Sequence, residues 1–158
     1  MKFAGEFTVP ARREVVYDRL NDAELFASCV EGVRDMVALD DGRYTAVLET
    51  KIAYIKFKFQ IAVSFVENIV PERIVAQAEG TPIGVVGRMT STVAATLIET
   101  GDATTISYEM DVALTGKLGS LGQPVLKAKA KEMERSFVKN LNVHFAADAA
   151  SEPAEAAR

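Results

Sequence analysis

The chain contains little of what most catalytic and metal sites are made from. Among its 158 residues there are one cysteine, Cys29, one histidine, His144, and no tryptophan. A single cysteine excludes an intramolecular disulfide and a multi-cysteine metal site, which fits a reducing cytoplasm. A hydrolytic nucleophile needs a base beside it, so a pairing of Cys29 with His144 is the one arrangement to consider. The simpler interpretation, which we favour, is a buried Cys29 and a His144 at the surface or near a helix end.

Long apolar runs and an excess of positive charge are lacking as well. No apolar stretch reaches the roughly 20 residues that span a bilayer, and no apolar segment follows Lys2 as in a secretory signal, so we expect a cytoplasmic protein. The net charge of -4 argues against nonspecific nucleic-acid binding. Glycine-rich phosphate loops and clusters with metal-ligand spacing are missing too. The sequence therefore predicts no catalytic residue, no metal site and no nucleic-acid partner.

The patterns that are present divide the chain into strands and helices. Residues 2–9 alternate between apolar and polar and end at Pro10, which indicates a strand. Residues 11–20 and 23–29 have helical spacing, and Asp22 offers an N-cap for the second of these short helices. Alternating runs separated by turn signals then predict an antiparallel meander. Its strands are residues 33–39, 43–53, 56–67, 73–79, 87–98 and 104–114.

A long final helix follows the meander. Three glycines and a proline between residues 115 and 124 mark the change to helical spacing, and Gly116, Gly119 and Gly122 are also a candidate hinge. One apolar stripe then runs to Phe145, and an apolar stripe needs a sheet face to cover it. We predict an α+β domain over residues 1–146, a curved sheet of about seven strands under this helix. Residues 147–158 carry no large apolar side chain and are expected to be a disordered tail.

Several motifs in this order resemble one known family. They are residues 7–11 (FTVPA), 20–22 (LND), 29–32 (CVEG) and 115–122 (TGKLGSLG). Together they resemble the CoxG family of carbon monoxide dehydrogenase subunits, which is part of the START-like superfamily, over about residues 1–146. The resemblance implies a helix-grip (START/Bet v 1-like) fold with two short helices after the first strand. It also implies an accessory role beside molybdenum-containing dehydrogenases, with links to the cytoplasmic membrane and to quinones.

The resemblance also implies a cavity, because sheet and helix in helix-grip folds commonly do not close fully. Its expected lining is Tyr44, Leu48, Thr50, Ile52, Phe57, Phe59, Ile61, Met89, Thr92, Val93, Tyr108, Met110, Met133, Phe137 and Leu141. The other interpretation of these residues is a plain hydrophobic core. The lining is almost free of charge, so a ligand should be neutral and apolar. A quinone with an isoprenoid tail, a sterol or a fatty acyl chain fits, and no covalently bound cofactor is expected.

Three surface features suggest contact with a membrane or a partner. The segment 80–87 contains Ile83, Val85 and Val86 without a charge, and its side chains either fold back onto the core or form a mobile apolar lip. The hairpin tip with Tyr54 and Ile55 has the same character, flanked by lysines. The third is a basic stripe on the last helix, which is either a solvated face or a docking surface for anionic lipid or an acidic enzyme. The stripe consists of Lys127, Lys131, Arg135 and Lys139.

These observations lead to one main hypothesis and two alternatives. The main one is a non-catalytic accessory protein of a molybdenum hydroxylase of the carbon monoxide dehydrogenase type, which binds an apolar lipid or quinone and links the dehydrogenase to the membrane quinone pool. The second is an enzyme like the polyketide cyclases and aromatases of the same superfamily, which would use Tyr44, Tyr108 or Glu49. That enzyme requires an ionisable residue inside the pocket with a shifted pKa. The third is a ligand-free adaptor for membrane recruitment.

Overall fold

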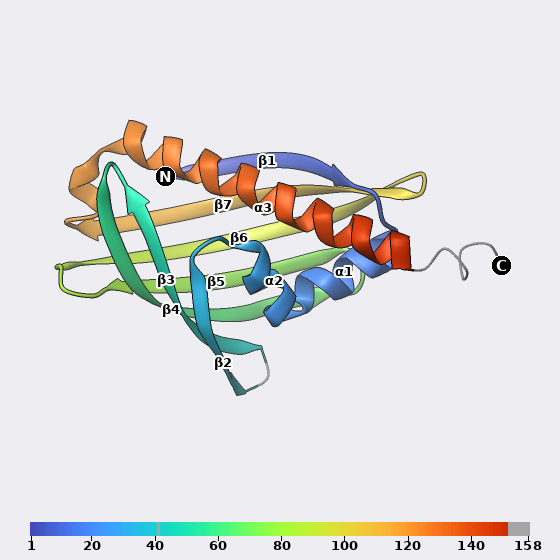
Figure 1. Cartoon of the computed structure of the whole chain (residues 1–158), viewed down its shortest axis with the longest axis horizontal. Helices are drawn as coiled ribbons and strands as arrows, with labels where there is room; N and C mark the ends of the chain where they lie inside the picture. The colour runs from blue at the N-terminus through green and yellow to red at the C-terminus, as the bar shows by residue number, and fades with distance from the viewer. Residues whose placement is uncertain (41, 152–158) are drawn as a thin grey trace.

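The computed structural model describes residues 1–40 and 42–151 as one sheet with three helices (Figure 1). The elements are β1 (Lys2–Val9), α1 (Arg13–Asn21), α2 (Ala23–Cys29), β2 (Val33–Asp40), β3 (Arg43–Ile52), β4 (Ile55–Ile69), β5 (Arg73–Pro82), β6 (Gly87–Thr100), β7 (Ala103–Gly116), the short 3₁₀ turn η1 (Gly119–Leu121) and α3 (Gln123–Ser151). All neighbouring strands pair antiparallel, in the order β1-β7-β6-β5-β4-β3-β2.

The helix α3 runs across one face of this curved sheet, and α1 and α2 close the end of the sheet where α3 finishes (Figure 1). Its nearest neighbours are β1, β3 and α2, so it spans from one side of the sheet to the other. A seven-stranded antiparallel sheet with a long C-terminal helix and two short helices confirms the predicted fold class. The face of the sheet toward α3 is called the inner face below.

Local signals account for the ends of the helices. Asp22 caps α2 as predicted, because its Oδ1 accepts hydrogen bonds from the backbone N–H of Glu24 at 3.1 Å and of Leu25 at 3.3 Å. The helix α3 continues to Ser151, beyond the predicted domain boundary at residue 146. The rest of the predicted tail, residues 152–158, lies outside the described residues.

Buried apolar side chains form two separate clusters, one at each end of the inner face. The α1 cluster lies under α1 and the last turns of α3, and consists of Val9, Val16, Tyr17, Leu20, Cys29, Ile74, Leu97, Ile106, Leu141 and Phe145. The hairpin-tip cluster lies near the β3–β4 turn and consists of Leu48, Ile52, Phe57, Phe59 and Leu118. Each cluster removes several large side chains from water, which stabilises the fold at both ends of α3.

The strand register corrects two of our predictions. Thr92 pairs with Asp111 on the outer face and is exposed, so it cannot line a cavity with Val93; successive side chains of a strand point to opposite faces. The predicted loop 80–87 is shorter than expected, because β5 continues through Pro82 and pairs with β4 there. The connection between β5 and β6 is therefore residues 83–86.

Candidate functional site

The middle of the inner face, between the two clusters, is the best candidate for a binding site. Here the strands present two rows of side chains directly across from one another. One row is Tyr44, Val63, Ala78, Ser91 and Val112, and the next is Phe65, Ala76, Val93, Met110 and Phe3. Every one of these side chains is only half-buried although it faces α3. The helix therefore does not seal the middle of the sheet as it seals both ends.

Small residues create this space. On the inner face β5 presents Ala76 and Ala78 side by side, and β6 presents Ser91 opposite Ala78. A large side chain at any of these positions would extend toward α3 and close the gap. We did not include β5 in the predicted lining, although the alternation in AQAEG (residues 76–80) places its small residues on one face.

The structure divides the predicted lining residues among three places. Most of them belong to the buried ends or pack against them, namely Leu48, Ile52, Phe57, Phe59, Ile61, Met89 and Met133 at the hairpin-tip end and Phe137 and Leu141 at the α1 end. For these the plain-core interpretation describes their packing. Tyr44, Val93, Tyr108 and Met110 face the half-buried middle, and Thr50 lies at its edge.

One ionisable pair lies inside the molecule and was missed. Tyr108 projects from β7 toward α3, and its hydroxyl donates a hydrogen bond to the Glu134 carboxylate. Burial and this contact together hold the pKa of Tyr108 well above its ordinary value. The sequence shows Glu134 only as one of the charges on the last helix. It lies three residues before Phe137 and seven before Leu141, so the helical period places it on the same face as both.

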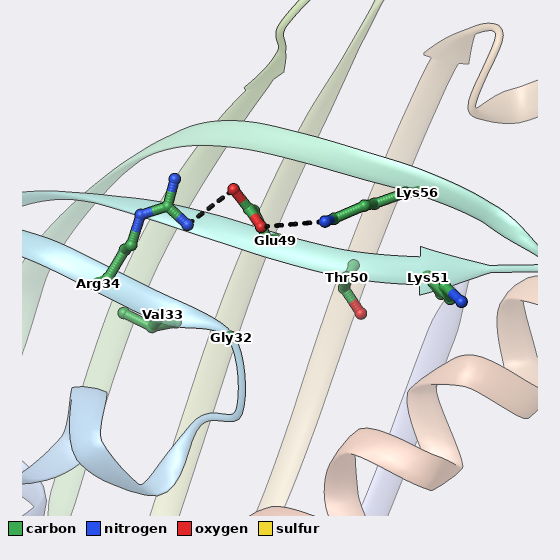
Figure 2. A pocket seen from close by; sticks show the side chains of 7 residues that line it. All are labelled: Gly32, Val33, Arg34, Glu49, Thr50, Lys51 and Lys56. Carbon is green, nitrogen blue, oxygen red and sulfur yellow. Dashed lines mark ion pairs between the residues drawn. The ribbon is translucent and has the colours of Figure 1, made fainter.

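Two pockets open at the sides of the inner face. A pocket of about 370 Å³ lies where β2 begins, lined by Gly32, Val33, Arg34, Glu49, Thr50, Lys51 and Lys56. Figure 2 shows Thr50 pointing toward the side of α3, while Arg34 and Glu49 point to the other side of β3. A pocket of about 340 Å³ opens between α3 and β7, lined by Met1, Asp111, Val112, Ala113, Leu114, Gly119, Gln123 and Leu126.

Glu49 is held on the outer side of the first pocket. Its carboxylate pairs with the Arg34 guanidinium at 2.7 Å and with Lys56 Nζ at 3.7 Å (Figure 2). The hydrogen bond from Arg34 lowers the pKa of Glu49 below its ordinary value, which keeps the group ionised. Glu49 therefore acts as an ion-pair partner at the rim, not as an acid or base inside the cavity.

The first pocket depends on the backbone of Gly32, and Gly32→Ala is expected to lower the free energy of unfolding by about 2–3 kcal/mol. Gly32 has φ +89°, and an added Cβ would collide with the backbone oxygen of Glu49. The same strand edge is joined by a hydrogen bond from the Glu49 N–H to the Gly32 carbonyl at 3.0 Å. Urea denaturation followed by circular dichroism measures the loss.

Gly84→Ala is the matched control. Gly84 also has a positive φ, +83°, but nothing lies within 4 Å of a Cβ built there. This variant should therefore cost only the backbone strain, about 1 kcal/mol. Equal losses in the two variants would show that the collision at Gly32 does not occur in solution.

The predicted apolar contact residues lie together at the hairpin-tip end of the molecule. The backbone N–H of Ile83 donates to the carbonyl of Lys58 at 2.8 Å, which ties the 83–86 connection to β4 next to the hairpin. Tyr54 is 100% exposed and Val86 is 85% exposed, and the remaining members, Ile55, Ile83 and Val85, are exposed too. Of the two alternatives for this segment, the structure has the side chains pointing outward. We call these five residues the apolar end.

The remaining candidates occupy ordinary positions. Lys127, Lys131, Arg135 and Lys139 are all exposed along α3. Cys29 is fully buried and burial raises the pKa of its thiol, which is the opposite of what activates a nucleophile. His144 Nε2 lies 3.3 Å from the Ser28 hydroxyl, near the end of α3 as expected.

Two searches of the described part of the chain found nothing. Residues 1–40 and 42–151 include no group of three or more His, Cys, Asp or Glu side chains arranged to hold a metal ion. Nor does any helix among them combine the length and the apolar character needed to cross a membrane.

Comparisons with known proteins connect this fold to one family and to several solved structures. The family model for CoxG, a subunit of carbon monoxide dehydrogenase, matches residues 5–146. A conserved protein from Geobacillus kaustophilus superposes with a TM-score of 0.86 at 20% identity, covering 92% of this chain and 95% of that one. A START superfamily protein from Mycobacterium smegmatis gives 0.65 at 17% identity, covering 91% and 96%. The Zhui aromatase/cyclase from a Streptomyces species gives 0.68 at 13% identity, covering 92% and 93%. No curated protein matches the chain.

Proposed function

Because the chain belongs to the CoxG family of carbon monoxide dehydrogenase subunits, we propose that it is a non-catalytic accessory protein of a molybdenum-containing dehydrogenase of that type. In this role it carries a quinone or another apolar lipid between the sheet and α3, and it links the dehydrogenase to the quinone pool of the membrane. The family supports the accessory role, and the geometry of the inner face supports the ligand.

The observation that carries the ligand proposal is the half-buried middle of the inner face. Its side chains are apolar or small, and they lie between two buried clusters that hold the fold without them. An ionic ligand would lose its hydration there without compensation, whereas an apolar one removes the exposed side chains from water. An apolar ligand therefore stabilises this region more than water does.

The direct test is to extract the purified protein with organic solvent and identify bound lipid by mass spectrometry. Native mass spectrometry of the same preparation gives the stoichiometry. We expect one apolar molecule per chain. Recovery of no lipid, together with no binding of added quinone, would end the carrier proposal and leave the ligand-free adaptor.

The apolar end supports the membrane part of the proposal. The turn at its tip is made by Ala53 and Tyr54, with φ of 51° and 68°, conformations that glycine or asparagine adopts at less cost. Backbone strain of this kind together with a fully exposed tyrosine is typical of a functional position. Lys51, Lys56 and Lys58 surround the tip and are exposed, so an anionic lipid surface fits both the apolar centre and the basic rim.

Replacing the tip pair, Ala53→Asn with Tyr54→Gly, is expected to stabilise the fold and weaken membrane binding. Asn-Gly is the preferred pair for this turn, so the free energy of unfolding should rise by roughly 1 kcal/mol. Loss of the exposed aromatic side chain removes on the order of 2 kcal/mol of burial in the lipid, about a 30-fold loss of affinity. Flotation with vesicles of phosphatidylcholine and phosphatidylglycerol measures this loss.

The control for this experiment lies on α3. The double variant Lys131→Glu, Arg135→Glu reverses charge on the basic stripe and leaves the apolar end intact. If the stripe is a solvated face, its flotation matches that of the wild type. Unchanged flotation of the tip variant would remove the apolar end from the membrane contact, and loss of flotation in the stripe variant would assign the contact to α3.

A second candidate function is favoured by the ionisable pair in the interior. An enzyme of the cyclase type needs an ionisable group beside its substrate, and Tyr108 with Glu134 supplies one where Glu49 does not. The aromatase/cyclase from Streptomyces has the same fold. Incubation with an enolisable polyketone thioester, with products followed by mass spectrometry, tests it. Turnover that disappears in Tyr108→Phe would favour the enzyme over the carrier.

A further inference from the structure

Tyr108 and Glu134 meet across the interior from two different elements. Tyr108 comes from the inner face of β7 and Glu134 from the face of α3 that also carries Phe137 and Leu141. Both side chains are half-buried, and Tyr108 follows Met110 of the open middle on the same face of β7. The pair thus lies where the open middle of the inner face meets the α1 cluster.

The position of the Tyr108 ring is fixed by its neighbours. Gly5 of β1 lies directly opposite, and a Cβ at Gly5 would come within 2.6 Å of the Tyr108 hydroxyl. The ring of Phe7 lies 6.4 Å from that of Tyr108, and Phe7 in turn contacts Phe137 edge-on at 6.4 Å. The absence of a side chain at Gly5 allows the phenol to lie over β1, and the aromatic rings support it from the α1 side.

The hydrogen-bonding capacity of the pair is one-sided. An ionised carboxylate only accepts hydrogen bonds, and the one proton of the Tyr108 hydroxyl is already donated to Glu134. What remains free is the second carboxylate oxygen and the lone pairs of the phenol oxygen. A ligand that enters the open middle therefore meets acceptors, so a donor gains a hydrogen bond there and a carbonyl does not.

We infer that Tyr108 and Glu134 form a subsite for the hydroxyl end of an apolar ligand, so that the chain selects a phenol, an apolar alcohol or a hydroquinone over the corresponding ether or quinone. This inference rests on the proposed carrier function. It narrows the ligand class from any neutral lipid to one that carries a hydrogen-bond donor. For a quinone pool, it means that the reduced form binds more tightly than the oxidised form.

Selection of this kind is expected to be substantial. A hydrogen bond to a charged group in a partly buried site contributes roughly 1.5–3 kcal/mol, which corresponds to about a 10- to 150-fold preference. An ether of the same shape leaves the carboxylate oxygen without a partner after displacing its water. The preference therefore reflects loss of a contact for the wrong ligand as well as gain for the right one.

The test uses para-heptylphenol and its methyl ether, para-heptylanisole, as matched probes. Their dissociation constants are measured by isothermal titration calorimetry with the full chain. The wild type should bind the phenol at least about 10-fold more tightly. Glu134→Gln places an amide donor beside the phenol and should bring the ratio close to one. Tyr108→Phe, which removes one of the acceptors, should reduce the ratio as well.

Two control variants change similar groups elsewhere. Tyr44→Phe removes a hydroxyl from the β3 side of the same inner face, and Glu132→Gln neutralises an exposed carboxylate of α3 that pairs with Lys129 at 3.4 Å. Both should keep the wild-type ratio. Equal affinity of the wild type for the two probes would overturn the hydroxyl subsite and leave the carrier function standing. Binding of neither probe would overturn the carrier function and the subsite with it.

Discussion

Val93→Trp is expected to abolish most ligand binding while leaving the fold in place. Val93 lies on the inner face between Ala76 and Met110 and is only half-buried. An indole there extends into the space above the small residues of β5, where the ligand is proposed to lie. Displacing about three ligand methylenes would cost roughly 2.4 kcal/mol, or about a 50-fold loss of affinity. Titration with para-heptylphenol measures the loss.

Thr92→Trp is the matched control for this variant. Thr92 is the adjacent residue of β6 but points to the outer face, so the same indole is added to the opposite side of the same strand. Its affinity for the probe should equal that of the wild type. A loss of about 1–3 kcal/mol in unfolding free energy for Val93→Trp, as in an overpacked core, would contradict the open middle. Unchanged affinity would place the ligand elsewhere.

Much of the fold was predictable because its signals are local. The alternation of β3, β4 and β7 assigned each side chain to its face, and the cap at Asp22 marked the start of α2. The turn residues also located the hairpins. These features depend on a few neighbouring residues, and the hydrophobic pattern reports them directly.

The errors arose where position depends on distant parts of the chain. Thr92 was grouped with Val93 because of its hydroxyl, although a period of two separates them. Glu134 was counted as a surface charge, since acidic residues in helices are usually solvated and only the packing of α3 on β7 brings it to Tyr108. The open middle was expected from the resemblance, but its cause is the row of small residues in β5, which matters only once β5 lies at the centre of the sheet.

The glycine-rich segment before α3 illustrates the same limit. The sequence predicted a hinge at Gly116, Gly119 and Gly122 because glycines are permissive. In the structure Leu118, between two of these glycines, is 1% exposed and belongs to the hairpin-tip cluster. The segment is therefore anchored at its centre, and its glycines allow the backbone to bring that anchor into the cluster.

Leu118→Ala is accordingly expected to be one of the most destabilising substitutions in the chain. Truncating a fully buried leucine leaves a cavity and costs about 2–5 kcal/mol, a large share of the roughly 5–15 kcal/mol that a domain of this size has. Leu121→Ala, a half-buried neighbour at the edge of the same cluster, should cost clearly less. Thermal and urea denaturation measure both losses. Amide exchange at residues 117–123 should also become faster in Leu118→Ala, since the start of α3 loses its anchor. Equal small losses in the two variants, with unchanged exchange, would mean that the glycines act as a free hinge after all.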